Sequence, residues 1–434
     1  MNAPELARRI VKGLRSHGHR AYFVGGCVRD LLLKVNPKDY DIATDARPEE
    51  VERAFPGSLG VGAHFGVMLV RDGDEQVEVA TFRSDHNYVD GRHPSEVLFE
   101  TDPRKDVLRR DFTINALLMD PASGEVLDYV GGQEDLADGV IRAIGNPEER
   151  FREDHLRLLR AVRFAARLGF EIESVTEGAI IRLSPLILDV AAERNRDELV
   201  RILTEGAARR GFEMLFRTGL LQQLLPEVVA MRGVQQPPEY HPEGDVWTHT
   251  MIMLDGLRNP APELALGVLL HDVGKPPTFR VADRIRFDGH VDAGVELTRG
   301  IMARFRFSND EARQVEALVA NHMRFMDTPR MKESTLKRFL RLPELDEHLE
   351  LHRLDCSSSH GSLDNYDFVL EKRAEFGEEK IAPPRLVTGQ DLIDAGYRAG
   401  VEFGRVLREV EDAQLEGRVT TKEEGLALAK RLMG

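Results

Sequence analysis

The sequence predicts an α+β protein in which a mixed head of short strands and helices precedes a long helical region. Two observations support this division. Residues 1 to about 140 combine short β-rich runs with turns, whereas the chain beyond residue 147 shows helical periodicity interrupted by Gly and Pro. The 434 residues correspond to about three domains of roughly 150 residues, so each part is long enough to bury a core.

The head is expected to contain six strands and two helices. Apolar runs bounded by turn residues predict the strands, and apolar residues at helical spacing predict the helices. The strands are expected at residues 21–24, 40–43, 66–70, 77–82, 113–119 and 126–129, and the helices at residues 5–17 and 48–54.

The rest of the chain is expected to be helical, with helices that include residues 153–168, 196–205 and 263–270. Proline pairs at residues 237–238 and 383–384 interrupt this pattern and are candidate boundaries. We therefore expect four domains, at residues 1–140, 141–236, 237–360 and 361–434.

Composition limits the function further. A net charge of −15 argues against non-specific coating of nucleic acid but allows a local basic groove. The longest apolar run, residues 264–270, is far shorter than the roughly 18 residues of a membrane span, so no membrane association is expected. With only two cysteines, Cys27 and Cys356, the chain is expected to work in a reducing cytoplasm.

A glycine turn and two carboxylates predict a phosphate-transfer site in the head. Gly25 and Gly26 join a strand to a helix, so backbone N–H groups converge where Arg29 can add guanidinium donors to a triphosphate. Asp39 and Asp41 share one strand face and can hold a divalent metal between them. Either motif alone is usually a simple turn, but together they indicate nucleotidyl transfer. Glu78 is either a third carboxylate here or a solvent-facing residue.

Basic residues follow in two further segments. Arg109, Arg110 and Asp111 precede an apolar run that includes Asn115, and they are either site residues or a solvated strand end. In the predicted helix 153–168, arginines cluster on one face opposite the apolar residues. Together with arginines of the next helix they predict a groove for nucleotide and RNA phosphates, or else they only solvate the helices. The set is Arg157, Arg160, Arg163, Arg167, Arg194, Arg196 and Arg201.

A second group of polar residues suits a transition metal, because imidazole and carboxylate are its usual ligands and the metal can activate water toward a phosphoester. A single histidine is more often structural. The group consists of His249, His271, Asp272, His290, His322 and Asp355.

Several motifs resemble the class II tRNA nucleotidyltransferases, the family that includes CCA-adding enzymes and bacterial poly(A) polymerases. The motifs are GGCVRDLLL, PKDYDIATDA, RRDFTINAL, EDHLRLLRAVRFAARLGF and ERNRDELVRIL, between about residues 20 and 230. Residues 387–428 are similar to the tail of CCA-adding members. The resemblance implies a polymerase-β-like head followed by a helical neck, body and tail.

The resemblance also implies roles for individual residues. Asp39 and Asp41 would bind Mg²⁺, and Arg110 and Asp111 would contact the ribose region of the nucleotide. Glu153, Asp154 and Arg157 would select the base: a carboxylate accepts from the exocyclic amine of C or A while Arg donates to the ring, so no template is needed. The expected nucleotide-binding set is Gly25, Gly26, Arg29, Arg109, Arg110, Asp111, Asn115, Glu153, Asp154, Arg157, Arg160 and Arg163.

Residues 85–94 lie where CCA-adding members carry a flexible loop associated with the switch from C to A addition. Asp90 and Arg92 fit that loop, whereas His93 departs from the second arginine often found there. The alternative interpretation is a surface hairpin loop.

The second polar group resembles the HD phosphohydrolases, because His271-Asp272 precedes Val273-Gly274-Lys275 and has a histidine upstream and an aspartate downstream. This resemblance implies four primary metal ligands. His290 and His322 would bind a second metal or a substrate phosphate, and Lys275 would contact phosphate. The four primary ligands are His249, His271, Asp272 and Asp355.

The leading hypothesis is a template-independent enzyme that adds or repairs the 3′-terminal CCA of tRNA. It would use CTP, ATP and Mg²⁺, bind the acceptor stem and elbow, and carry a transition metal in a hydrolytic HD centre. One alternative is an A-adding, CC-adding or poly(A)-synthesising enzyme; the HD residues and the tail disfavour poly(A) synthesis. Another is an HD phosphatase or phosphodiesterase with a nucleotide-binding head, which the intact Asp39 and Asp41 disfavour.

Overall fold

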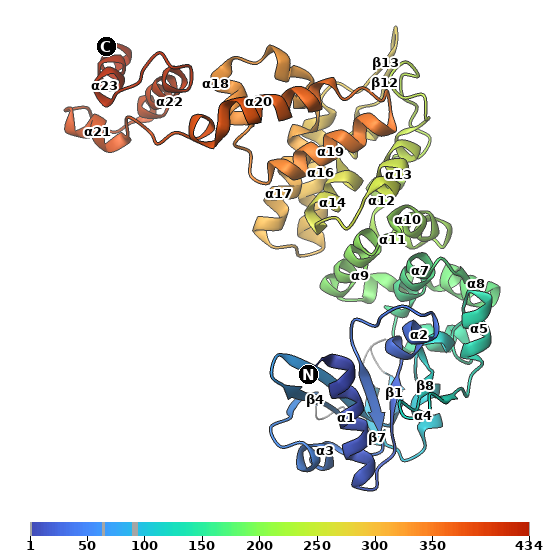
Figure 1. Cartoon of the computed structure of the whole chain (residues 1–434). Helices are drawn as coiled ribbons and strands as arrows, with labels where there is room; N and C mark the ends of the chain where they lie inside the picture. Colours follow the sequence, from blue (N-terminus) through green and yellow to red (C-terminus); the bar gives the residue numbers. More distant parts are fainter. Residues whose placement is uncertain (1, 63–65, 89–93, 434) are drawn as a thin grey trace. The chain divides into compact units, whose positions relative to one another are not determined.

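The computed structural model describes residues 2–62, 66–88 and 94–433 and divides into two compact units, Met1–Pro226 and Glu227–Gly434 (Figure 1). The first unit carries the sheet and the first helices, and the second is almost entirely helical. This confirms the predicted α+β fold class. Among the described residues, no helix is both long and apolar enough to cross a membrane.

A seven-stranded sheet with the order β3-β4-β5-β2-β1-β8-β9 lies at the centre of the first unit. Neighbouring strands are antiparallel except for β2 and β5, which are parallel. A separate hairpin is formed by β6 (Arg83–Tyr88) and β7 (Pro94–Phe99). The sheet strands are β1 (Ala21–Val24), β2 (Asp41–Thr44), β3 (Leu59–Gly62), β4 (Val67–Asp72), β5 (Glu75–Thr81), β8 (Leu118–Met119) and β9 (Val126–Leu127).

The predicted strand at residues 113–119 is wrong in its first half. Thr113–Asn115 form a 3₁₀ helix, and only Leu118–Met119 pair with β1. The reason is that residues 112–113 pair with residues 142–143 instead. Phe112 forms a β-bridge with Ala143, and the Thr113 N–H donates to the Arg142 carbonyl at 3.0 Å.

Helices cover the sheet and continue into the neck. In α1, buried Leu6, Ile10 and Leu14 follow helical spacing, as predicted for residues 5–17. The helices are α1 (Ala3–Ser16), α2 (Gly26–Leu32), α3 (Pro48–Ala54), α4 (Pro103–Leu108), α5 (Gly132–Asp138), α6 (Pro147–Glu153), α7 (Arg157–Leu168), α8 (Ser174–Leu183), α9 (Ala192–Thr204), α10 (Ala208–Arg217) and α11 (Leu220–Leu224). A short parallel pair, β10 (Val140–Ile141) and β11 (Glu171–Ile172), accompanies them.

The single helix predicted over residues 153–168 is wrong, because two helices occupy this stretch. Helix α6 ends at Glu153, Asp154 adopts an extended conformation with φ −142°, and α7 begins at Arg157. The Asp154 carboxylate accepts the N–H of Leu156 at 3.2 Å, a local bond that competes with continued helix.

The second unit consists of a helical body and a smaller tail with its own apolar cluster around Phe403, Val406 and Val410. Its helices are α12 (Pro226–Val229), which spans the unit boundary, α13 (Val246–Gly256), α14 (Pro262–Leu270), α15 (Lys275–Thr278), α16 (His290–Arg304), α17 (Asn309–Asn321), α18 (Glu333–Phe339), α19 (Leu345–Ser358), α20 (Asp364–Ile381), α21 (Gly389–Asp394), α22 (Val401–Leu415) and α23 (Lys422–Met433). The body also contains a 3₁₀ helix (His322–Arg330) and the hairpin of β12 (Arg280–Val281) and β13 (Ile285–Arg286).

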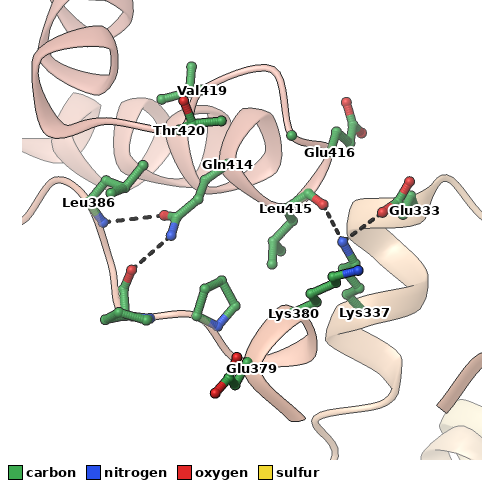
Figure 2. Close-up of a pocket in the computed structure, with 13 residues that line it drawn as sticks. Glu333, Lys337, Glu379, Lys380, Leu386, Gln414, Leu415, Glu416, Val419 and Thr420 are labelled. Atoms are coloured by element: carbon green, nitrogen blue, oxygen red, sulfur yellow. Dashed lines mark hydrogen bonds and ion pairs between the residues drawn. The ribbon is translucent and has the colours of Figure 1, made fainter. Parts of the chain in front are cut away.

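Polar contacts join the tail to α18 around an open pocket of about 530 Å³ (Figure 2). The buried Lys337 ammonium donates to the carbonyl of Leu415 at 2.6 Å, at the end of α22. The Gln414 side chain donates to the Pro384 carbonyl at 2.8 Å and accepts the N–H of Leu386 at 3.3 Å. These bonds hold the end of α22 against α18 and against the segment of Pro384 and Leu386.

Close backbone packing at Gly274 brings α16 against the turn that follows α14. A Cβ at this position would collide with the carbonyl oxygen of His290 and lie 2.5 Å from the amide nitrogen of Gly294. Only glycine allows this approach, which places His290 next to the His271-Asp272 segment.

We predict that Gly274→Ala destabilises the second unit by about 1–3 kcal/mol, the usual cost of overpacking. Trp247, the single tryptophan of the chain, lies on α13, so its fluorescence during urea unfolding follows this unit. Gly300→Ala on α16 is the matched control, because nothing lies within 4 Å of its added Cβ. Equal unfolding midpoints for the two variants would contradict the prediction.

Candidate functional site

The glycine turn of the head lies beside the start of β2. The antiparallel register sets Phe23 opposite Ile42, so β1 ends where β2 begins. Gly25 occupies φ +75° and precedes α2 without any capping side chain. The Cys27 thiol, in the first turn of α2, donates to the backbone carbonyl of Asp41 at 3.8 Å. The turn and the first predicted carboxylates therefore meet at one end of the sheet.

Carboxylates gather at this end of the sheet. In the parallel pairing of β2 with β5, Asp41 lies opposite Glu78, which settles Glu78 as a neighbour of the predicted site. Burial, followed by the charge of Glu78, raises the pKa of Asp41 to about 6 against the opposing effect of Arg110. Asp39, two residues before Asp41, is exposed and raises this pKa further. Such crowded carboxylates fit a divalent cation, which would relieve their repulsion.

Asp106 holds the two arginines of the RRD motif, a role that the sequence analysis missed. Its Oδ1 accepts two bonds from Arg109, at 2.9 and 2.7 Å, and its Oδ2 accepts two from Arg110, at 3.2 and 2.9 Å. Burial opposes ionisation of Asp106, but both guanidinium groups outweigh it and lower its pKa. The arginines follow Asp106 by three and four residues at the end of α4, and this spacing was the available signal.

Asp111 links the head to helix α7. Its Oδ2 accepts from Nε and Nη2 of Arg160, at 2.9 and 2.6 Å. Burial opposes ionisation of Asp111, yet Arg160 outweighs it and lowers the pKa to about 2. Nearby, Asn115 accepts from Nη1 of the buried Arg29 at 2.7 Å. Arg29 also donates twice to Asp30, so a contact between Arg29 and a triphosphate would require these bonds to be exchanged.

The three residues expected to select the base lie at the junction of α6 and α7. Arg157 donates to Glu153 at 2.7 Å and to the backbone carbonyl of Arg109 at 3.0 Å, which connects it with the RRD motif. Asp154 lies 3.2 Å from Nη2 of Arg194. The structure thus brings Glu153, Asp154 and Arg157 together with Arg109, and their contact with a nucleotide stays a prediction.

The arginines of α7 are paired rather than arrayed on an open basic face. Arg163 is only 5% exposed and donates to the buried Glu198 at 2.6 Å. The ring of Phe164 lies under the guanidinium groups of Arg29, Arg160 and Arg163, at 5.4, 5.2 and 4.3 Å. Helical spacing located the arginine face correctly, but it did not reveal the acidic partners on α9. Phosphate binding by this face stays a prediction.

The predicted loop residues Asp90, Arg92 and His93 lie outside the described residues.

The HD residues assemble in the second unit from α13, the end of α14, α16, the 3₁₀ helix and α19. Ligand atoms of His249, His271 and Asp355 all lie within 4.8 Å of one another, as do those of Asp272, His290 and His322. Because Asp272 directly follows His271, the two trios are adjacent. The six residues predicted from the sequence are therefore all brought together.

The charges of this cluster prepare it for a cation. The buried Nε2 atoms of His249 and His271 face carboxylates, with Asp355 Oδ1 at 3.1 Å and Asp272 Oδ2 at 3.2 Å. Burial lowers the pKa of His322 to about 4, which keeps its imidazole neutral. Burial would raise the pKa of Asp272, yet His271 and Lys275 hold it well below its usual range. Imidazole nitrogens and ionised carboxylates that converge in this way fit a divalent metal ion.

Glu243 is a further residue of this cluster that the sequence analysis missed. Its Oε1 lies 2.7 Å from Nδ1 of His249 and 2.9 Å from Nδ1 of His241. Burial lowers the pKa of His249, but the carboxylates of Asp355 and Glu243 outweigh it and raise the pKa to about 9. Nδ1 of His249 is engaged by Glu243, while Nε2 faces Asp355, so a metal bound by Nε2 would replace the proton that the ring carries there. Glu243 precedes His249 by only six residues, but no motif marked it.

Lys275 is buried and already bonded. Its ammonium donates to Asp272 at 2.6 Å and to Gln236 at 2.7 Å. The predicted contact of Lys275 with phosphate would require one of these bonds to be exchanged.

Three family models match the chain. They are the Poly A polymerase head domain over residues 21–142, the Probable RNA and SrmB- binding site of polymerase A over residues 169–231, and the HD domain over residues 245–356. They cover the glycine turn with its carboxylates, α8 to α11, and both histidine trios.

Similar proteins extend this result. The CCA-adding enzyme of Bacillus subtilis (strain 168) is 46% identical over 215 residues, 50% of this chain and 54% of that protein, so the chain spans about half the length of this relative. That of Lactobacillus helveticus (strain DPC 4571) is 30% identical over 430 residues, 97% of this chain and 95% of that protein. The structure of the Bacillus stearothermophilus CCA-adding enzyme in complex with CTP is 27% identical, covers 99% of this chain and 98% of that one, and has a TM-score of 0.75.

We predict that Glu243→Ala lowers the affinity of the histidine cluster for Mn²⁺ by about 10–100-fold, the usual effect of removing the carboxylate behind a histidine ligand. Calorimetric titration measures this in chains that also carry Asp41→Asn, so that the head carboxylates contribute less. Glu296→Ala on α16, a glutamate whose side chain is 77% exposed, is the control. Equal Mn²⁺ affinity in both variants would show that Glu243 does not orient His249.

Proposed function

Because the chain belongs to the family of CCA-adding enzymes, we propose that it adds or repairs the 3′-terminal CCA of tRNA from CTP and ATP, without a nucleic-acid template. Its tRNA contacts would lie at the acceptor stem and elbow. The observation that carries this proposal is the meeting of Asp41, Glu78 and the glycine turn at one end of the sheet, with Arg110 acting on Asp41. A nucleotidyl-transfer site requires carboxylates and phosphate-binding groups in this arrangement.

The reaction joins the 3′-hydroxyl of tRNA to the α-phosphorus of the nucleotide, and pyrophosphate leaves. We assign the metal ligands to Asp39 and Asp41. Mg²⁺ held there would supply charge neutralisation for the phosphates and a lower pKa for the attacking hydroxyl. Gly25 would let the phosphates approach the backbone, and Arg110, held by Asp106, would face them with a fixed guanidinium.

Base selection is assigned to Glu153, Asp154 and Arg157. The carboxylate of Asp154 would accept from the exocyclic amine of C or A, while the guanidinium of Arg157 would donate to the ring. Arg157 is held by the backbone carbonyl of Arg109, so the selecting groups and the RRD motif keep a fixed spacing. That spacing supports recognition by protein side chains alone.

We predict that Asp41→Asn lowers nucleotide incorporation by at least about a thousandfold, because several kcal/mol of charge stabilisation are lost. The assay uses tRNA transcripts that end at the discriminator base, after C and after CC, with CTP and ATP in Mg²⁺ and sequencing of the 3′ ends. Wild type should complete CCA on all three.

Asp72→Asn, on the surface of β4 in an exposed pair with Arg9, is the control for this experiment. Residual activity near wild type in Asp41→Asn would refute the assignment. Addition of A to the CC-ended transcript alone, or long A tails, would instead identify an A-adding enzyme or a poly(A) polymerase.

A second activity is favoured by the two adjacent trios of metal-ligand residues. We propose that this centre hydrolyses phosphoesters with a transition metal, which would supply an activated water. The oxygen of water bonds to phosphorus, the bond from phosphorus to the ester oxygen breaks, and the ester oxygen leaves with a proton. His249, His271, Asp272 and Asp355 would be the primary ligands, with His290 and His322 beside them.

We predict that His271→Asn abolishes hydrolysis of p-nitrophenyl phosphate and leaves CCA addition unchanged, whereas Asp41→Asn does the reverse. The rate is followed by absorbance with Mn²⁺, Co²⁺, Ni²⁺ or Mg²⁺ added to the full chain, and a transition metal should give the highest rate. His360→Asn, at an exposed histidine, is the control. Hydrolysis that survives His271→Asn would exclude this centre as its source.

The working compartment is proposed to be the cytoplasm. Cys27 and Cys356 are both buried free thiols. Unbridged cysteines are typical of proteins that work in a reducing compartment.

A further inference from the structure

A small hairpin in the body carries three arginines on few residues. Strands β12 and β13 pair antiparallel, with Arg280 directly opposite Arg286 and Val281 opposite Ile285. Arg284 lies in the connecting loop and is exposed. In Figure 1 the hairpin projects from the body near α13. Three guanidinium groups are therefore presented together on a protruding element.

This charge arrangement does not stabilise the hairpin. Like charges directly opposite one another across a strand pair are destabilising, and strands of two residues offer few hydrogen bonds to offset them. Arg286 pairs with Asp283 at 2.8 Å, whereas Arg280 and Arg284 have no ion-pair partner among the residues that the structure describes. An anion bound between the arginines would remove the repulsion.

The base of the hairpin touches the histidine cluster. The rings of Phe279 and Phe287 close the hairpin with centroids 5.9 Å apart. Phe287 in turn lies 6.5 Å from the ring of His290, and the Lys275 ammonium lies 5.3 Å from its centroid. His290 belongs to one metal-ligand trio and Lys275 is bonded to Asp272 of the same trio. The arginines thus begin a few residues from the proposed hydrolytic centre.

We propose that the hairpin of residues 279–287 binds the phosphodiester backbone of single-stranded RNA and directs its 3′ end to the histidine cluster. The substrate class of that centre is then a polynucleotide end rather than a mononucleotide. Guanidinium groups suit backbone phosphates, and Phe279, which is 38% exposed, offers a ring on which an unpaired base can stack. In a chain of net charge −15, binding of a polyanion requires such a local basic element.

This inference rests on the proposed hydrolase activity, and its test separates the two. The substrates are an RNA 12-mer with a 3′-phosphate and p-nitrophenyl phosphate, which share the bond that breaks. Full-length wild type is compared with Arg280→Gln/Arg286→Gln, with the charge-conserving Arg280→Lys/Arg286→Lys, and with Arg313→Gln on α17. Arg313 is a matched control because its side chain is also exposed, by 74%, but lies on a helix rather than on the hairpin.

We expect KM for the RNA to rise about tenfold in the double glutamine variant, with kcat unchanged. The slope of log KM against log salt concentration should fall by about 1.4, or 0.7 for each lost phosphate contact. Hydrolysis of p-nitrophenyl phosphate should not change in any variant. The double lysine variant should keep most of the RNA affinity, and Arg313→Gln should match wild type.

Three outcomes would overturn the inference. An unchanged KM for RNA in the double glutamine variant excludes phosphate binding by the hairpin. Equal losses on both substrates assign the arginines a structural role. Wild type that hydrolyses p-nitrophenyl phosphate but not the RNA overturns the substrate class alone, whereas wild type inactive on both overturns the proposed hydrolase activity together with it.

Discussion

The ion pair between Asp111 and Arg160 is the contact on which the head depends. It joins the RRD motif to helix α7, and the Asp111 side chain is only 9% exposed, whereas that of Arg160 is 32% exposed. Breaking such a pair would leave a buried charge uncompensated, so it holds its two elements at one spacing. The bonds of Arg157 to Glu153 and to the carbonyl of Arg109 lie one helical turn away and depend on that spacing.

The histidine cluster of the body differs from the head in how its polar groups are paired. Around the RRD motif and α7, guanidinium groups and carboxylates satisfy one another within the chain. In the body, the buried Nε2 atoms of His249 and His271 converge with the carboxylates of Asp355 and Asp272, at 3.1 and 3.2 Å. Glu243 and the Val268 carbonyl engage the Nδ1 atoms of the same two rings. Both rings are therefore oriented through Nδ1, while Nε2 of each points at a carboxylate of the cluster, which is the arrangement of histidine ligands in a metal centre.

Local patterns predicted much of the fold and the candidate ligands, whereas contacts between distant segments escaped prediction. The glycine turn and the spacing of Asp39 and Asp41 are visible within a few residues. Glu78 acquires meaning only through the parallel pairing of β2 with β5, which requires knowledge of the sheet order. Likewise, Arg163 lies on the predicted arginine face of α7, but its partner Glu198 is 35 residues away on another helix. The error in the first half of the strand predicted at residues 113–119 has the same origin, in the pairing of Phe112 with Ala143.

The joint between α18 and α22 determines what removal of the tail would mean. Lys337 donates to the carbonyl of Leu415, Arg338 pairs with Glu411 and Asp412, and Arg341 pairs with Glu411. A chain shortened at Pro383 would lose every one of these acceptors and expose the apolar residues beside them. Lower activity in such a shortened chain would therefore have two causes, which are destabilisation of the body and loss of any binding contributed by the tail. Point substitutions on the outer surface of the tail separate the two effects, because they leave the joint intact.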